Sequence, residues 1–300
     1  MVFKKLGYFF IISILCMCHC TTLSAQETLK QSASKTLIII GAGAGGTAAA
    51  IQAARMGVKV HLLSENPWLG GMLTAAGVSA IDGNHQLPSG LWGEFRAKLY
   101  QHYGGPEAVA TGWVSNTHFE PKVGDSILKS MAQYPHLIIH YNTQFKSISK
   151  RENGWDISFV TGGKTTHLSG AVVIDGTENG DVIPLVGAEF NVGMDAQSDT
   201  GEKEAPKNSN SIVQDLTYTI ILKDLGRDAK QNELLTMHPS YEASLFECAC
   251  RLPGSDTPKG VVDHIQMLDY AKLPGNKYLI NWPNCGNDYF LDWPNMPLDE

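Results

Sequence analysis

The chain has 300 residues, of which 43% are hydrophobic and 18% charged, and its net charge is −7. A chain of this length and composition buries at least one large core, which excludes a disordered or fibrous protein. The acidic balance, without a dense run of Lys and Arg, argues against a nucleic-acid partner, because such partners need basic side chains for the phosphates.

The first 25 residues have the three regions of a secretory signal peptide: two lysines, an apolar stretch over residues 6–18, and small residues up to Ala25. We expect cleavage after Ala25, followed by a polar linker over residues 26–35. The sequence therefore predicts an exported protein, periplasmic or at the cell surface. An uncleaved anchor and a lipid-modified cysteine are the alternatives, and only in those cases do we expect contact with a membrane.

Residues 36–65 have the pattern of a strand, a turn, a helix and a second strand. The apolar segments 36–40 and 58–63 predict the two strands, and the small residues between them predict the helix. An acid, Glu65, follows the second strand. The turn has the sequence Gly41-Ala42-Gly43-Ala44-Gly45-Gly46.

The glycines and the acid of this unit indicate a dinucleotide site. Gly41 permits the tight turn, Gly43 lets the backbone approach a pyrophosphate, and Gly46 lets the helix lie close to the sheet. The N-terminus of the helix presents free N–H groups to the phosphates. Glu65 lies about 20 residues after the turn, where a carboxylate accepts hydrogen bonds from ribose hydroxyls. These features predict that the chain binds FAD or NAD.

The middle of the chain predicts a helical insertion and then a return to the sheet. Gly70, Gly71 and Met72 form a loop that is either a second phosphate or flavin contact or simply a turn. We expect the buried strand 171–175 to rejoin the parallel sheet. The other expected elements are helices 91–100 and 122–133, strand 137–141, and an antiparallel meander of strands 143–149, 154–161 and 164–168.

The last third of the chain has a different pattern. Residues 195–210 are polar and predict a loop, and strands are expected at 216–222 and 277–282. No second glycine-rich turn of this type and no internal repeat is present. A second nucleotide-binding domain is therefore not expected.

Three motifs resemble those of the large FAD-dependent oxidoreductase family. They are residues 41–46, 70–72 and 171–181, and within the family the chain is similar to a secreted bacterial subgroup through residues 70–74, 87–95 and 281–283. The resemblance covers residues 36–300. It implies an α/β fold: a Rossmann-like FAD-binding domain with a parallel sheet, a small antiparallel meander and a helical insertion over residues 36–187, and an inserted α+β substrate domain over residues 188–300.

The resemblance also implies which residues contact the cofactor. Many relatives carry Asp-Ala-Thr-Gly-Asp-Gly-Asp where this chain has Asp175-Gly-Thr-Glu-Asn-Gly-Asp181, which leaves the placement of that loop against the flavin open. The late segment with which the family returns to the FAD domain has no counterpart after Asn284, so we expect the N-terminal part of a longer protein. The implied FAD contacts are residues 41–46, Glu65, Gly70, Gly71, Met72, Asp175, Gly176, Gly180 and Asp181.

Candidates for a catalytic base are harder to find, because a flavin carries out the redox chemistry itself. His85, His118, His238 and His264 lie in polar or loop-like surroundings, and each is either a base or a structural residue. Glu120 is either a site acid or the cap of the helix that follows it. The site candidates we retain are His85, His118 and Glu120.

No metal is expected. After removal of the signal the remaining cysteines are Cys248, Cys250 and Cys285, whose spacing fits neither a zinc site nor an iron–sulfur cluster. Partly buried thiols are the expected state, and an exported compartment would permit one disulfide to Cys285.

The sequence thus predicts an exported FAD-dependent oxidoreductase with a small organic substrate. Its electrons would pass to oxygen, a quinone or a protein acceptor. One alternative is a non-catalytic surface protein that binds glycans through the aromatic side chains near residues 282–293. A further alternative is an NAD-dependent dehydrogenase, which explains residues 70–71 and 175–181 less well.

Overall fold

The computed structural model describes residues 36–226, 263–281 and 288–292, together with positions 230, 236 and 238–242. The expected signal peptide, the linker over residues 26–35, the three cysteines after residue 226, Trp282 and Trp293 lie outside the described residues.

The chain divides into two compact units. Unit 1 comprises residues 1–67 and 132–186, and unit 2 comprises residues 68–131 and 187–300. The helical insertion therefore groups with unit 2, while the expected domain boundary at residues 187 and 188 stays a prediction. No helix in the described part of the chain has the length and apolarity needed to cross a membrane.

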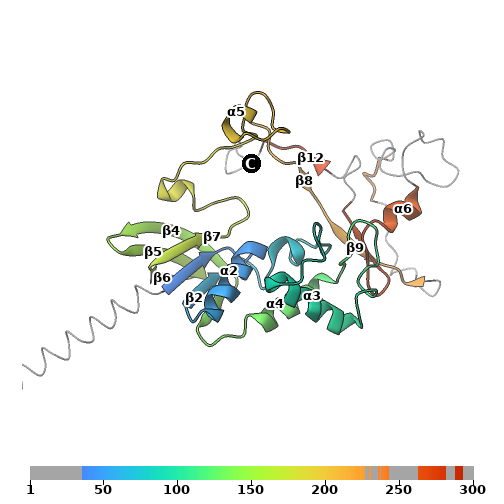
Figure 1. Ribbon diagram of the computed structural model, residues 1–300, viewed down its shortest axis with the longest axis horizontal. Coiled ribbons are helices and arrows are strands. Elements are labelled where there is room, and N and C mark those ends of the chain that lie inside the picture. The colour runs from blue at the N-terminus through green and yellow to red at the C-terminus, as the bar shows by residue number, and fades with distance from the viewer. Residues whose placement is uncertain are drawn as a thin grey trace, which may run out of the picture. The chain divides into compact units, whose positions relative to one another are not determined.

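Unit 1 contains a four-stranded parallel sheet in the order β3-β2-β1-β7. Its strands are β1 (Thr36–Ile40), β2 (Lys59–Leu63), β3 (Leu137–His140) and β7 (Val172–Asp175). Figure 1 shows β7, in yellow-green, beside the blue β1, although the two are far apart in the sequence. The expected return of residues 171–175 to the sheet is confirmed, but the strand is not buried: Val172 is exposed and the other residues of β7 are half-buried.

The helix that joins β1 to β2 is α2 (Ala44–Arg55). Its small residues let it lie close to the sheet, and Ala50 and Ala54 are buried almost completely. Gly57, at φ 82°, then turns the chain into β2 in a conformation that favours glycine.

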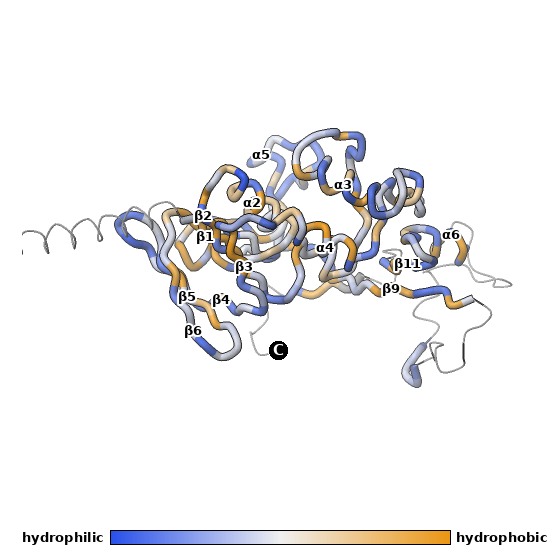
Figure 2. The backbone as a smooth tube through the Cα atoms, turned by 90° about the horizontal axis from the view of Figure 1, so that it is seen from below, coloured by the Kyte–Doolittle hydropathy of each residue, from blue (hydrophilic) through white to orange (hydrophobic). Residues whose placement is uncertain are grey.

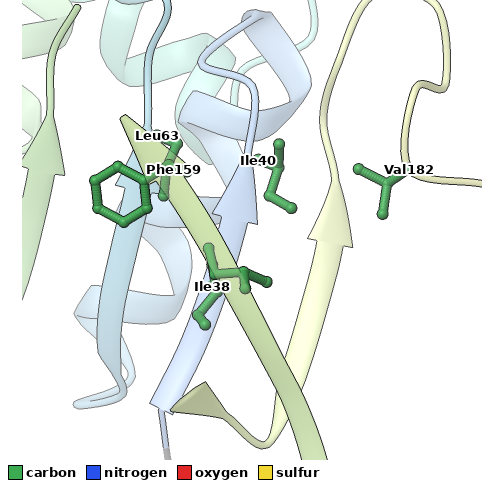
Figure 3. Packing of buried hydrophobic residues seen from close by; sticks show 6 residues of the cluster. Ile38, Ile40, Leu63, Phe159 and Val182 are labelled. Atoms are coloured by element: carbon green, nitrogen blue, oxygen red, sulfur yellow. The ribbon is translucent and has the colours of Figure 1, made fainter. Parts of the chain in front are cut away.

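The expected antiparallel meander is also present, as β4 (Thr143–Arg151), β5 (Gly154–Thr161) and β6 (Lys164–Gly170). Alternate residues of β5 face the parallel sheet, so that Phe159 packs with Ile38 and Leu63 (Figure 3). Figure 2 shows the resulting contrast between hydrophobic β1 and the hydrophilic tips of the meander. The full core cluster is Ile38, Ile40, Leu63, Ile157, Phe159 and Val182.

Unit 2 contains both expected helices, as α3 (Gly90–Tyr103) and α4 (Pro121–Met131). The rings of Phe95 and Phe119 meet edge to face, with their centroids 5.4 Å apart. The buried face of α4 includes Asp125, whose Oδ1 accepts a hydrogen bond from the backbone N–H of Leu69 at 2.9 Å. A carboxylate on that face was not expected from the apolar pattern.

The other elements of unit 2 are short. The strand expected at residues 216–222 is divided into two, because the chain changes its pairing partner at Tyr218 and Thr219: the first part pairs with residues 288–289 and the second with residues 277–280. The short elements of unit 2 are η1 (Gly71–Leu73), α5 (Gln197–Thr200), β8 (Leu216–Thr217), β9 (Ile220–Lys223), α6 (His264–Leu268), β10 (Lys272–Leu273), β11 (Lys277–Ile280) and β12 (Asp288–Tyr289). Unit 1 contains one further short element, η2 (Pro184–Val186).

Candidate functional site

The four parallel strands of unit 1 end level with one another. Ile40 pairs with Leu63 on one side and with Asp175 on the other, and Leu63 pairs with His140. The segments that follow these residues therefore gather at one edge of the sheet, which we call the carboxyl edge. Ligands of open α/β sheets bind at this edge, at the point where the strand order reverses, and here that point lies between β1 and β7.

The glycine-rich turn at the carboxyl edge is packed too tightly for side chains at two positions. Gly41 has φ +98°, and a β-carbon there would collide with the carbonyl oxygen of Gly176. A β-carbon on Gly46 would collide with the carbonyl oxygen of Gly41. These contacts hold the turn, the helix and the loop after β7 together in unit 1.

The N-terminus of α2 has no capping hydrogen bond from a side chain, at the place where a phosphate is expected. Gly43 is the N-cap, and Ala44 and Gly45 are exposed. In the described part of the chain, no atom outside the neighbouring residues and the backbone of the helix lies within 4 Å of a β-carbon built on Gly45, and no side chain forms a capping hydrogen bond. The first N–H groups of a helix have no partner inside it, so this end fits a pyrophosphate. Ala42 instead is buried, and its carbonyl accepts a hydrogen bond from Thr47 Oγ1 at 2.9 Å.

The loop after β7 is held in shape by Asp175. Its Oδ1 accepts hydrogen bonds from the backbone N–H and the hydroxyl of Thr177, at 3.0 and 2.7 Å, and its Oδ2 accepts one from Val182 N–H at 2.9 Å. The hydroxyl of Thr177 in turn accepts one from Asp181 N–H at 2.8 Å. Gly180 completes the loop at φ +71°. Asp175 therefore acts on the carboxyl edge by shaping the loop, and its two oxygens are already hydrogen-bonded within it.

Glu65 borders an open cavity of about 390 Å³ in unit 1. This volume is within the range of about 300–1,000 Å³ that is usual for small-molecule sites. Backbone hydrogen bonds join the segments around it, from Thr143 N–H to Ser64 O and from Ser64 N–H to His140 O, both at 2.9 Å. Carboxylate, amide and hydroxyl groups line it and suit a ribose and a base. The lining residues are Glu65, Asn142, Thr143, Gln144, Val160 and Gly162.

The lining residues other than Glu65 were not predicted. Asn142, Thr143 and Gln144 follow one residue after the end of β3, which runs parallel to β2. Their place at the carboxyl edge therefore follows once the strand at residues 137–141 is assigned to the parallel sheet. The apolar strand at residues 137–141 was therefore the feature of the sequence from which these lining residues could have been predicted.

The predicted contacts at residues 70–72 lie in unit 2. Gly70 has φ +103° and Gly71 φ +53°, so the turn itself requires glycine at both. A β-carbon on Gly70 would stand 2.5 Å from Leu128 of α4, and Met72 is exposed. Their contact with a flavin stays a prediction.

The three candidate catalytic residues all lie in unit 2. His118 is completely buried, burial lowers its pKa, and its Nδ1 lies 3.3 Å from the carbonyl oxygen of Val109. His85 is half-buried, with its Nδ1 3.3 Å from the amide nitrogen of Asn116.

The carboxylate of Glu120 forms an ion pair and a hydrogen bond within unit 2. Its carboxylate pairs with Lys277 of β11, and it accepts a hydrogen bond from the hydroxyl of Tyr103 at 3.4 Å. Burial raises the pKa of Tyr103 to about 12, and the charge of Glu120 adds to that rise. The carboxylate thus ties α3 to β11, while the backbone carbonyl of Glu120 receives the first hydrogen bonds of α4.

Comparison with known proteins places the chain in a family. The sequence model of the family described as FAD dependent oxidoreductase matches residues 36–300. No curated protein matches the chain. Among solved structures, the chain is similar to CabE, an aromatic hydroxylase from angucycline biosynthesis, with 15% identity and a TM-score of 0.41 over 54% of this chain and 35% of that chain.

Two further solved structures are similar over the same share of this chain. The anhydrotetracycline hydroxylase OxyS from Streptomyces rimosus has 14% identity and a TM-score of 0.39, over 54% of this chain and 35% of that chain. The halogenase PltM, solved with phloroglucinol and FAD, has 15% identity and a TM-score of 0.37, over 54% of this chain and 38% of that chain. The chain spans well under half the length of these proteins.

The family match extends over the whole described part of the chain. It includes the turn at residues 41–46, Glu65 and the loop that Asp175 shapes, which are the parts of unit 1 that fit a dinucleotide. The chain belongs to the FAD-dependent oxidoreductase family, whose cofactor is FAD.

Proposed function

We propose that this protein is an exported FAD-dependent oxidoreductase that oxidises or reduces a small organic substrate. The observation that carries the proposal is the carboxyl edge of unit 1, where a helix N-terminus without a capping hydrogen bond and the cavity beside Glu65 follow adjacent strands of one sheet. When bound, FAD supplies the redox chemistry. The protein supplies the binding site and controls access of solvent.

Each part of the edge has a role in this proposal. The N–H groups at the start of α2 bind the pyrophosphate, with Gly43 providing room for it. The carboxylate of Glu65 accepts hydrogen bonds from the ribose hydroxyls. The side chains of Asn142 and Gln144 offer donors and acceptors to the base. Asp175 keeps the loop after β7 against the turn.

Export and the electron acceptor are further parts of the proposal. The N-terminal pattern of charged, apolar and small residues supports export. Nicotinamide cofactors are scarce outside the cytoplasm, so oxygen, a quinone or a protein takes the electrons. Mass spectrometry of the mature protein from the host's exported fraction tests the first point, with Gln26 as the expected first residue.

The cofactor is tested by denaturing the purified full chain and recording the visible spectrum and mass of what it releases. FAD at about one per chain supports the proposal, since the described residues form one parallel sheet with a single carboxyl edge. A colourless protein that FAD does not reconstitute contradicts it. Glycan-binding assays on that same colourless protein then test the non-catalytic alternative.

A further inference from the structure

One carboxylate lies where the phosphates of the cofactor are expected. Oε1 of Glu178 is 2.7 Å from the position that a β-carbon on Gly43 would take. Gly43 is the N-cap of α2, and its missing side chain is what leaves room for a pyrophosphate. Glu178 therefore occupies space that the proposed function assigns to the ligand.

The backbone around Glu178 is held in place, but its side chain is free to rotate. On one side Asp175 accepts hydrogen bonds from Thr177, and on the other it accepts one from Val182 N–H. The Glu178 side chain is exposed, and its carboxylate is the far end of a flexible chain. Moving it away from Gly43 thus requires side-chain rotation and no change in the loop.

The position of this carboxylate has an electrostatic reason. The start of a helix carries a partial positive charge and attracts anions. The first turn of α2, which the structure describes in full, contains no acidic residue. Glu178, on a loop distant in sequence, brings the negative charge to this end. A pyrophosphate brings further negative charge to the same place, and like charges at short range repel each other.

We infer that Glu178 is a built-in competitor of the cofactor's pyrophosphate, whose carboxylate lies beside the N-terminus of α2 in the cofactor-free chain and must rotate away when FAD binds. The inference rests on the proposed function, because it takes the carboxyl edge as the FAD site. Glu178 thereby weakens FAD binding and stabilises the cofactor-free unit 1.

The test compares the affinity of FAD for the cofactor-free full chain and for two variants that lose the same charge. Glu178→Gln removes the competitor. Glu152→Gln is the matched control, since Glu152 is exposed in the turn between β4 and β5 of the same unit. By titration of flavin fluorescence, Glu178→Gln binds FAD about tenfold more tightly than wild type, whereas Glu152→Gln binds it as wild type does.

Three further readouts separate competition from an unspecific effect of charge. ADP carries the pyrophosphate without the flavin, so Glu178→Gln gains affinity for it by a similar factor. The gain shrinks as salt rises, because salt screens exposed charges. The cofactor-free Glu178→Gln variant unfolds at a temperature lower by roughly 1–4 °C, because α2 loses its anion.

The results that overturn the inference are equally specific. It fails if Glu178→Gln binds FAD no more tightly than wild type, or if affinity for FAD rises while affinity for ADP does not. Should Glu178→Gln fold poorly, Glu178→Asp keeps the charge but shortens the side chain, and it must bind FAD more tightly than wild type. If wild type and Glu152→Gln both fail to bind FAD, the proposed function has failed, and the inference falls with it.

Discussion

The imidazole rings of His61 and His140 stack against each other on neighbouring strands of the parallel sheet. Their planes differ by 12° with centroids 5.2 Å apart, and Nδ1 of His61 lies 2.9 Å from Nε2 of His140. Phe159 of the meander packs edge-on against His140. One ring donates the hydrogen bond and the other accepts it, which requires that at least one ring stays neutral.

This pair predicts that the protein loses stability in mild acid. Burial, with the charge of His140 and Lys59 adding to it, lowers the pKa of His61 from 6.5 to about 4, and burial also lowers the pKa of His140. The unfolded chain therefore takes up protons that the folded chain does not, and the free energy of unfolding falls as the pH drops from about 6.5 to about 4.

Urea unfolding at a series of pH values measures the effect. In His61→Asn the dependence on pH in this window becomes weaker, because one of the titrating rings is gone. His167→Asn is the control, since His167 is exposed on β6. A dependence on pH that is the same in wild type and His61→Asn would contradict the prediction.

A second prediction uses two adjacent glycines of the turn. Gly46→Ala places a methyl group against the carbonyl oxygen of Gly41, so the backbone must shift, and we expect a loss of about 2–4 kcal/mol in the free energy of unfolding. Gly45→Ala places the same methyl group in open space, and we expect no loss. Chemical denaturation of both variants gives the comparison, and equal losses would show that the crowding at Gly46 is unimportant.

A third prediction concerns Glu65. Replacing its carboxylate by an amide, in Glu65→Gln, removes a charged hydrogen-bond acceptor from the cavity, and we expect FAD to bind about 10- to 100-fold more weakly. Because Glu65 is exposed, the melting temperature of the cofactor-free protein stays unchanged. Titration with FAD and thermal unfolding check the two halves separately. Unaltered FAD affinity would remove Glu65 from the ribose site.

A fourth prediction tests the role of Asp175 in shaping its loop. Asp175→Asn weakens the hydrogen bonds to Thr177 and Val182, so their amides exchange hydrogen faster. Thr177→Val removes only the hydroxyl, and we expect a smaller increase that centres on Asp181, whose N–H it accepts. Hydrogen exchange read by mass spectrometry distinguishes the two patterns. Unchanged exchange in Asp175→Asn would mean that other contacts hold the loop.

Much of unit 1 could be predicted from the sequence, because its patterns are local. The apolar run at residues 36–40 specifies a buried strand, the run at residues 171–175 specifies a strand whose burial it overstates, and alternation specifies the meander. The carboxyl edge was harder, because Asn142 and Gln144 line the cavity only through the pairing of β3 with β2. The approach of Glu178 to Gly43 joins two distant segments, and no periodic pattern encodes it.

Two features of unit 2 that the sequence did not predict have the same origin. The segment at residues 216–222 alternates like one strand, but Thr219 donates a hydrogen bond to Ala76 O where the chain changes its partner. Glu120 has the sequence context of a site acid or a cap, yet its carboxylate pairs with Lys277, a residue far along the chain. Both outcomes depend on partners that the local sequence does not reveal.

The pairing of β1 with β7 also sets the order in which the protein becomes able to hold its cofactor. The turn at residues 41–46 leaves the ribosome early, but the carbonyl of Gly176 that packs on it and the loop shaped by Asp175 arrive only when synthesis has passed residue 182. Closing such a long loop is slow, and until then β1 has an unpaired edge. During this interval the free edge of β1 can pair with a wrong strand, and the nascent chain then has the greatest need of chaperones.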